Sequence, residues 1–297
     1  MPASLLPSFI ITFREGLEAA LVVAIVASYF KRTGNRGLNK YLYSGATVAV
    51  GASVLLGVSM SAVYGGLPGL SAEVFEGVAA LTATVVLTYM ILWMMRHSQT
   101  MRVELEQKLE MAVTAGQMLG IAAVSFVAVF REGFETVLFL TALVIIDSSG
   151  TLVGAIGASL AVIVLGVLLM RGTYRLDLNK FFQVTSIVLI VFAAGLAGYG
   201  AHELMEAGES SGMQLGVLGQ QAFDTNPPRN PDGSYLLLHE KGAVGSVLAA
   251  LVGYSGNPEW LRVIVYLGYW LVFGTYIFVT TRREKRSHLD DAHRAES

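Results

Sequence analysis

The sequence predicts an all-α integral membrane protein with seven transmembrane helices, and three observations lead to this prediction. Of the 297 residues 54% are hydrophobic and only 14% are charged, whereas a soluble domain carries about 25% charged residues. The mean hydropathy is +0.60, and the apolar residues gather in runs of the roughly 20 residues that cross a bilayer. Charged residues recur in one pattern inside two of these runs, which indicates an internal repeat.

Seven apolar runs are long enough to span a bilayer, and an eighth is too short. The first run lacks the basic segment and cleavage site of a signal peptide, so we expect it to be retained as a helix. The short run, 242–253, is expected to form an interfacial or re-entrant helix. It follows a turn-rich loop of Pro, Asn and Gly residues. The predicted spans are 5–30, 41–64, 72–95, 117–146, 151–170, 181–204 and 260–280.

The basic residues lie mainly on one side of the predicted membrane. Fifteen of the 20 Lys and Arg residues fall after the first, third, fifth and seventh spans. Arg14 and Arg131 lie inside spans, and only three basic residues fall on the opposite side. Because cytoplasmic loops carry an excess of Lys and Arg, the N-terminus is predicted to lie outside and the C-terminus in the cytoplasm.

One segment occurs twice in the chain. Residues 8–18 (SFIITFREGLE) and 125–135 (SFVAVFREGFE) are identical at seven of eleven positions. Three predicted spans separate the copies, and an odd number of crossings gives them opposite orientations. Inverted repeats are typical of transporters whose site lies near the midplane. We expect one permease domain over 1–297, made of repeat 1 (about 5–95), repeat 2 (about 117–204), an outer loop with a short interfacial helix (205–259), helix seven (260–280) and a basic cytoplasmic tail (281–297).

Each copy of the segment places two carboxylates inside the membrane. Glu15 and Glu18 are three residues apart and share a helix face, and so do Glu132 and Glu135. Since a charge at the centre of a span costs about 2.5–3.5 kcal/mol, the repeated cost indicates a function. Four convergent carboxylates repel one another and favour a bound cation. A donor set without His or Cys favours a hard metal ion.

The arginine of each motif is expected to support a glutamate. Arg14 lies four residues before Glu18, and Arg131 bears the same relation to Glu135, so each pair is within reach on a helix. The glycine of each motif is expected to let the two motif helices approach closely. Purely structural ion pairs are the alternative, and the repetition of the motif argues against them.

Further acidic residues lie on the predicted outer side. Glu73 and Glu76 are three residues apart near the outer end of the third span, where we expect them to gather cations at the entrance. The alternative is that the dipole of a helix N-terminus favours these carboxylates. His202, Glu203 and Glu206 end the sixth span. We expect an ordinary solvated helix end there, and metal binding at the entrance is the alternative.

The two charged motifs resemble those of a known family. Arg-Glu-Gly-Leu-Glu (14–18) and Arg-Glu-Gly-Phe-Glu (131–135) are similar to the paired R-E-x-x-E motifs of the high-affinity iron permeases, the oxidase-dependent iron/lead transporters. The resemblance covers the seven-helix layout and nearly the whole chain, including EVFEG (73–77) and AAGL (193–196). It implies a bacterial-type permease of the plasma (inner) membrane. By this resemblance the primary iron ligands are Glu15, Glu18, Glu132 and Glu135, with Arg14 and Arg131 in support.

The expected function is import of iron, ferric in this interpretation, as a transported substrate with no permanently bound cofactor. Another cargo such as lead or manganese is the alternative. An intramembrane metalloenzyme is less favoured, because di-iron bundles use Glu-x-x-His pairs and neither motif contains His. The sequence has no phosphate-binding loop of an ATPase. The expected partners are iron ions, membrane lipid and separate periplasmic or extracellular oxidase, peroxidase or iron-delivery proteins, with no nucleic acid.

Overall fold

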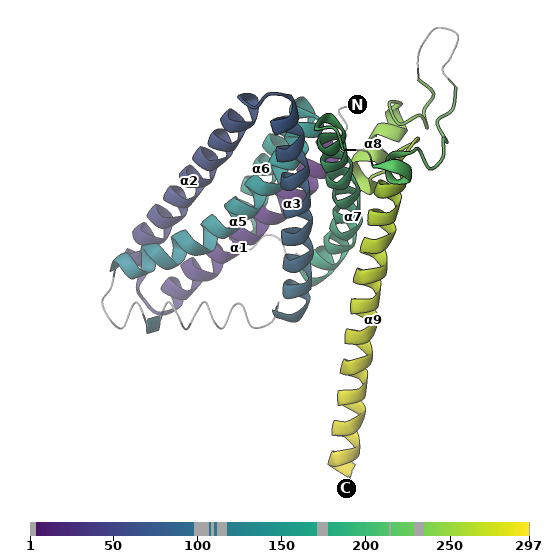
Figure 1. Cartoon of the computed structure of the whole chain (residues 1–297). Helices are drawn as coiled ribbons and strands as arrows, with labels where there is room; N and C mark the ends of the chain where they lie inside the picture. Colours follow the sequence, from purple (N-terminus) through teal and green to yellow (C-terminus); the bar gives the residue numbers. More distant parts are fainter. Residues whose placement is uncertain are drawn as a thin grey trace.

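The computed structural model of the chain describes residues 4–97, 107, 110–111, 118–170, 178–213, 215–228 and 235–296. This part of the chain is helical, as predicted, apart from loops and one isolated bridge between Gln221 and Glu259 (Figure 1). The α-helices are α1 (Leu5–Arg32), α2 (Asn39–Gly65), α3 (Gly69–His97), α5 (Met118–Ile146), α6 (Ser148–Met170), α7 (Leu178–Ser210), α8 (Ala243–Val252) and α9 (Trp260–Glu296), and the 3-10 turns are η1 (Arg36–Leu38) and η2 (Gly216–Gly219).

Two helices continue beyond their predicted ends. The prediction ended α7 at Leu204, where the long apolar run ends. The more polar turns that follow stay helical as far as Ser210. α9 runs to Glu296, where a tail was predicted. The segment 281–297 contains neither Gly nor Pro and is rich in good helix formers. Figure 1 shows that α9 extends well beyond the other helices.

The described helices suit a membrane. Five stretches are long and apolar enough to cross one. Helices α1 and α5 are about as long as these five stretches. They are not counted among them, because each carries one Arg and two Glu residues near its middle. Large apolar side chains such as Val54, Ile163 and Leu271 are 61–71% exposed on α2, α6 and α9. Lipid covers such surfaces at no cost, so the chain is a multi-pass membrane protein. The five stretches are Arg36–Gly65, Gly69–Met94, Ser148–Leu168, Lys180–Ser210 and Trp260–Val279.

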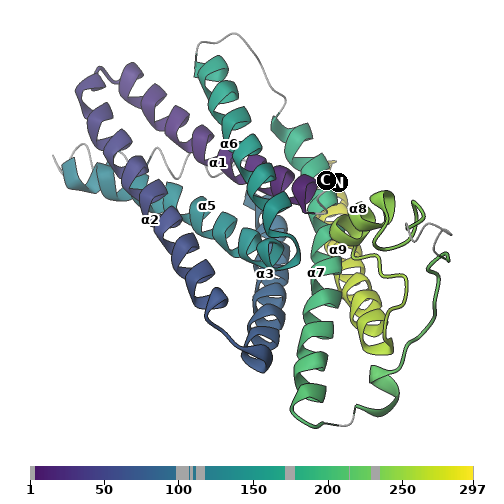
Figure 2. The ribbon, with the colours of Figure 1, turned by 90° about the horizontal axis from the view of Figure 1, so that it is seen from above.

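The helices pack mainly across the two halves of the chain. α2 packs on α5, α6 packs on α1, and α3 packs on α7, while α1 and α5 also contact each other. Helices α8 and α9 lie against α7 on the side away from α2 and α5, and α8 also contacts α1 (Figure 2). Each motif helix is therefore held by a helix from the other half.

Close contacts between these helices recur at constant offsets. A Cβ atom on Gly45 of α2 would meet the Ala122 carbonyl of α5, and one on Gly154 of α6 would meet the Leu5 carbonyl of α1. Leu5 and Ala122 are 117 positions apart, and Gly45 and Gly154 are 109 apart. Two further pairs of contacts follow the same rule, with 117 positions between the α1 and α5 residues and 109 between the α2 and α6 residues. The contact Gly133–Ser53 corresponds to Gly16–Val162, and the contact Gly57–Val137 corresponds to Gly166–Ala20.

The prediction that Gly16 and Gly133 bring the two motif helices together is wrong. A Cβ on Gly16 would lie 3.1 Å from Cγ2 of Val162 in α6, and Gly133 faces Ser53 of α2. These glycines instead let a helix of the other half approach each motif helix. The sequence gives no direct signal for which neighbour a glycine faces.

Gly77 of α3 is expected to tolerate no larger side chain. A Cβ there would lie 2.6 Å from Cγ of Leu204 and 3.0 Å from the Gly200 carbonyl oxygen of α7. Overpacking costs about 1–3 kcal/mol or more, so Gly77→Val should lower the thermal denaturation temperature in detergent. Gly51→Val is the matched control, because nothing lies within 4 Å of its Cβ position. Equal denaturation temperatures for the two variants would contradict this packing.

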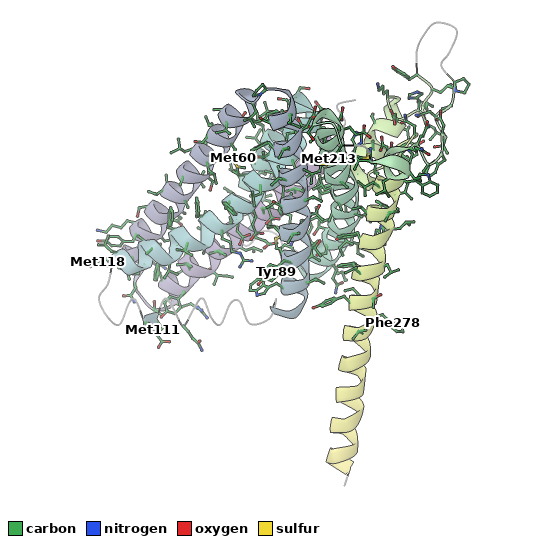
Figure 3. The ribbon with its side chains drawn as sticks, in the orientation of Figure 1. Met60, Tyr89, Met111, Met118, Met213 and Phe278 are labelled. Atoms are coloured by element: carbon green, nitrogen blue, oxygen red, sulfur yellow. The ribbon has the colours of Figure 1, made fainter. Side chains whose placement is uncertain are left out.

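The bundle has two distinct ends. The loop end, at the top of Figure 1, carries the described residues 211–213, 215–228 and 235–259, and α9 finishes at the opposite tail end. Figure 3 labels Met60 and Met213 at the loop end and Met118 at the tail end. Asp147 caps α6 at the loop end, since its carboxylate accepts from Gly150 N–H at 3.0 Å and from Ser4 N–H at 3.3 Å. Burial raises the pKa of Asp147, but these hydrogen bonds outweigh it and lower that pKa below its usual value.

Candidate metal centre

Three motif carboxylates come together in the interior. One oxygen each of Glu15, Glu132 and Glu135 lies within 4.8 Å of the others. The three residues are 0%, 9% and 7% exposed. Both oxygens of Glu15 and one oxygen of each partner have no hydrogen-bond donor. Because buried carboxylates are costly unless paired or bound to a metal, this arrangement suits a cation.

Glu18 stands beside this group rather than within it. Its Oε1 accepts a hydrogen bond from Nε of Arg14 at 3.2 Å. Glu135 accepts from Nε of Arg131 at 3.1 Å and also belongs to the cluster. Both predicted ion pairs are present, and the structure brings three of the four predicted glutamates into one group.

The two motif arginines have different surroundings. Arg14 is completely buried, and its Nη2 lies 3.7 Å and 3.5 Å from the sulfur atoms of Met90 and Met94 in α3. The side chain of Arg131 is 41% exposed, and its guanidinium lies over the Trp93 ring at 4.6 Å. Sequence reasoning missed these α3 residues, because an apolar side chain that holds an arginine looks like any other core residue.

A cavity of about 690 Å³ leads to the carboxylates between α1, α2, α5 and α6. Glu15 and Glu132 line it, and Tyr64 and Ser148 line it at the loop end. Most of the wall is apolar, with hydroxyl groups at intervals. The cavity therefore joins the carboxylate cluster to the loop end. Its other hydroxyl residues are Thr12, Ser53, Ser61, Thr136, Thr141, Thr151 and Ser159.

Toward the tail end the helices close together. Val26 and Phe30 of α1, Leu42 of α2 and Ile121 of α5 form a cluster with at most 1% exposure. None of these four residues lines the cavity. We call this group the tail-end cluster.

The predicted entrance residues lie at the loop end of α3. Glu76 accepts hydrogen bonds on both oxygens, from the Tyr64 hydroxyl at 2.6 Å and from the Tyr199 hydroxyl at 3.1 Å. Glu73 is half-buried, and its Oε2 has no hydrogen-bond donor. The two tyrosines belong to α2 and α7, and nothing in the spacing of the sequence pointed to them.

The end of α7 differs from its prediction. Ligand atoms of His202, Glu203 and Glu206 lie within 4.8 Å of one another. The solvated end predicted for this segment fits Glu206, whose side chain is 55% exposed, but not Glu203, which is 8% exposed. The outer loop folds back here at Glu259, whose Oε2 lies 3.3 Å from Nδ1 of His202.

Known proteins share this sequence over nearly its whole length. The profile of the iron permease FTR1 family matches residues 5–279. An uncharacterized protein of Archaeoglobus fulgidus is 41% identical over 281 residues, which cover 93% of this chain and 97% of that protein. The ferrous iron permease EfeU of Yersinia pestis is 35% identical over 264 residues, covering 88% of this chain and 89% of that protein.

A second permease gives the same result. The ferrous iron permease EfeU of Escherichia coli O6:K15:H31 (strain 536) is 35% identical over 264 residues, covering 88% of this chain and 91% of that protein. No solved structure matches the chain significantly. These relatives confirm the resemblance given by the two motifs: the protein is a transporter rather than an enzyme, and iron is its substrate rather than a cofactor. The chain belongs to the iron permease FTR1 family.

Proposed function

We propose that this chain imports iron across the plasma membrane through a site made by Glu15, Glu132 and Glu135, with Glu18 close by. One observation carries the proposal. Buried carboxylate oxygens without hydrogen-bond donors, contributed by both motifs, meet at a cavity that extends to the loop end. Arg14 and Arg131 hold Glu18 and Glu135 in place. Glu73 and Glu76 lie at the entrance.

All seven long helices cross the membrane in this proposal, with the loop end outside and the C-terminus in the cytoplasm. The motif glutamates of α1 and α5 support this topology, because they are buried inside the bundle and do not face the lipid. The bias of Lys and Arg toward the tail-end connections supports the orientation.

The two halves are proposed to be inverted repeats. A two-fold relation that exchanges 5–95 with 117–204 would make α1 equivalent to α5, α2 to α6 and α3 to α7. It would pair α2 with α5 and α6 with α1 in equivalent contacts, as observed. The constant offsets of the glycine contacts support the same relation.

Comparison of the two ends suggests how access alternates. The repeat offsets relate the four apolar residues of the tail-end cluster to Leu143, Asp147, Thr151 and Ser4 at the loop end, so only one of the four equivalent residues is apolar. There the Ser4 hydroxyl donates to the Leu143 carbonyl at 3.4 Å, and the Thr151 hydroxyl donates to the Asp147 carbonyl at 2.7 Å. We propose that these equivalent groups are the inner and outer gates. The cavity then represents the outward-facing state, and release requires the tail-end cluster to separate.

The cargo at the carboxylate site is proposed to be ferric iron. An oxygen-only donor set favours a hard ion, whereas the relatives above carry the name ferrous iron permease. A separate oxidase or peroxidase and iron-delivery proteins outside the membrane would supply the ferric ion. Lead and manganese are the alternative cargoes.

Proteoliposomes containing the purified chain test this function. Radioactive iron is supplied either as ferric citrate or with ascorbate, which keeps it ferrous, and excess Mn²⁺ or Pb²⁺ is added as competitor. We expect iron to accumulate above protein-free liposomes, faster from ferric citrate, with weak competition by Mn²⁺. Faster uptake with ascorbate would assign ferrous iron instead. No accumulation in either form would contradict iron transport.

A further inference from the structure

We propose that Tyr64, Glu76, Tyr199 and Glu203 form a second, ferric-binding site at the loop end, where iron binds before it reaches the central carboxylates. The proposal rests on the proposed function for its cargo and direction. The binding chemistry itself can be tested without transport. The sequence predicted Glu76 as part of an acidic entrance with Glu73, and it favoured a solvated helix end for Glu203 over metal binding with His202 and Glu206.

Side chains from three helices build this site. The Tyr64 hydroxyl of α2 donates to Oε1 of Glu76 in α3 at 2.6 Å, and the Tyr199 hydroxyl of α7 donates to Oε2 at 3.1 Å. Glu203 lies four residues after Tyr199, on the same face of α7, and its carboxylate is close enough to interact with Tyr199 and Glu76. Four oxygen donors, two phenols and two carboxylates, thus converge on one place between α2, α3 and α7.

This donor set suits iron(III) in particular. Oxygen donors favour hard ions, and a tyrosine oxygen is the protein ligand of haem iron in catalase. A metal ligand must lose its proton, so binding releases protons. Each phenol here already donates a hydrogen bond to Glu76. When an oxygen–iron bond replaces the O–H bond, Glu76 is therefore the first group to accept the proton. The proton then passes to the outer solution, and no electron is transferred.

The charge around the site also favours a cation. Glu203 is 8% exposed, and its carboxylate interacts with Glu76 and Glu206 as well as with His202. Arg262 brings a positive charge to this region, but it also interacts with Glu259 and Glu240. His202 and Glu206, whose ligand atoms lie with that of Glu203 within 4.8 Å, extend the donors toward the surface.

Tyr64 links the outer site to the transport route. It lines the same cavity as Glu15 and Glu132, and it is also the residue that donates to Glu76. An ion held by Tyr64 is therefore already at the loop end of the cavity that leads to the motif carboxylates. A contact that only tied α2 to α3 would have no reason to lie on this cavity.

Visible absorption spectroscopy tests the site, because iron(III) bound to a phenolate gives a charge-transfer band that a carboxylate site lacks. Purified protein is titrated with ferric citrate. We expect the band in the native chain, a weaker band in Tyr199→Phe, and its loss in the Tyr64→Phe/Tyr199→Phe double variant. Iron(III) binding should be at least about tenfold weaker in Glu203→Gln, which keeps both phenols. Tyr269→Phe is the matched control, since its hydroxyl lies 2.9 Å from that of Thr88, away from the site. It should keep the band.

Glu15→Gln separates this proposal from the proposed function. We expect that variant to keep the band and to lose uptake in proteoliposomes. A native chain without the band, or an undiminished band in the Tyr64→Phe/Tyr199→Phe double variant, would overturn the outer site. If uptake by the native chain persists in that case, the central transport site stands and only the outer site is wrong. Circular dichroism of each variant verifies that it is folded.

Discussion

Replacing Glu132 with glutamine is expected to abolish iron uptake, and Glu15→Gln should do the same. Each substitution keeps the shape of the side chain and removes one charge from the buried cluster. Loss of a group that only supports a metal ligand already reduces metal affinity about 10–100-fold, so loss of a ligand should lower uptake by at least about 100-fold. Radioactive iron uptake into proteoliposomes measures the effect.

Glu209→Gln is the control for these variants, because Glu209 is exposed at the end of α7, outside the cavity and the clusters described above. It should transport iron at the native rate. The amount of each variant in the membrane is measured alongside uptake. Native uptake by Glu15→Gln or Glu132→Gln would show that the motif glutamates only connect helices.

Arg14→Gln is expected to destabilise the protein much more than Arg131→Gln. Arg14 is completely buried and pairs with Glu18, whose side chain is 11% exposed. Removing one partner of a buried ion pair costs about 3–5 kcal/mol, because the other charge remains unpaired. The side chain of Arg131 is 41% exposed and rests on Trp93, so its loss should leave a smaller gap in the packed interior than loss of the fully buried Arg14. Thermal denaturation in detergent and the amount of folded protein in the membrane measure the difference.

The double variant Arg14→Leu/Glu18→Leu identifies the cause of this loss. Replacing both partners of a buried pair by apolar residues is often neutral, so the double variant should recover much of the stability that Arg14→Gln loses. Equal denaturation temperatures for Arg14→Gln and Arg131→Gln would show that the burial of Arg14 contributes nothing to stability.

The positions of the helices could be predicted well from the sequence. A membrane helix usually extends over the whole of its apolar run. Helix α5 accordingly begins and ends within one residue of the predicted span. The ion pairs within each motif followed from i, i+4 spacing alone, because both partners lie on one helix. Helix α7 was predicted too short, since apolar character ends before the helix does.

Contacts between helices could not be predicted. Gly16 and Gly133 were assigned to the contact between the motif helices, but each faces a helix of the other half. The sequence also could not separate Glu18 from the cluster of the other three glutamates, because all four share the same motif positions. Which carboxylate points at the cavity depends on how α1 and α5 cross, and that angle is set by α2, α3 and α6.

The outer tyrosines show the same limit. Tyr64 and Tyr199 are 135 positions apart and meet only because α2 and α7 both pack beside α3 near Glu76. Glu203 is 8% exposed although it lies near the polar end of α7, where Glu259 of the outer loop contacts the neighbouring His202. Sequence spacing describes one helix at a time, so sites shared by three helices become visible only in the structure.

The central claim is that both motifs build one metal site. Iron bound per chain, measured by elemental analysis after equilibrium dialysis, tests it most directly. The Tyr64→Phe/Tyr199→Phe background removes both phenol ligands of the outer site, and with them iron binding there. We predict that this background binds iron, and that adding either Glu15→Gln or Glu132→Gln removes the same ion. Retention of that iron by either variant would contradict a site shared between the two motifs.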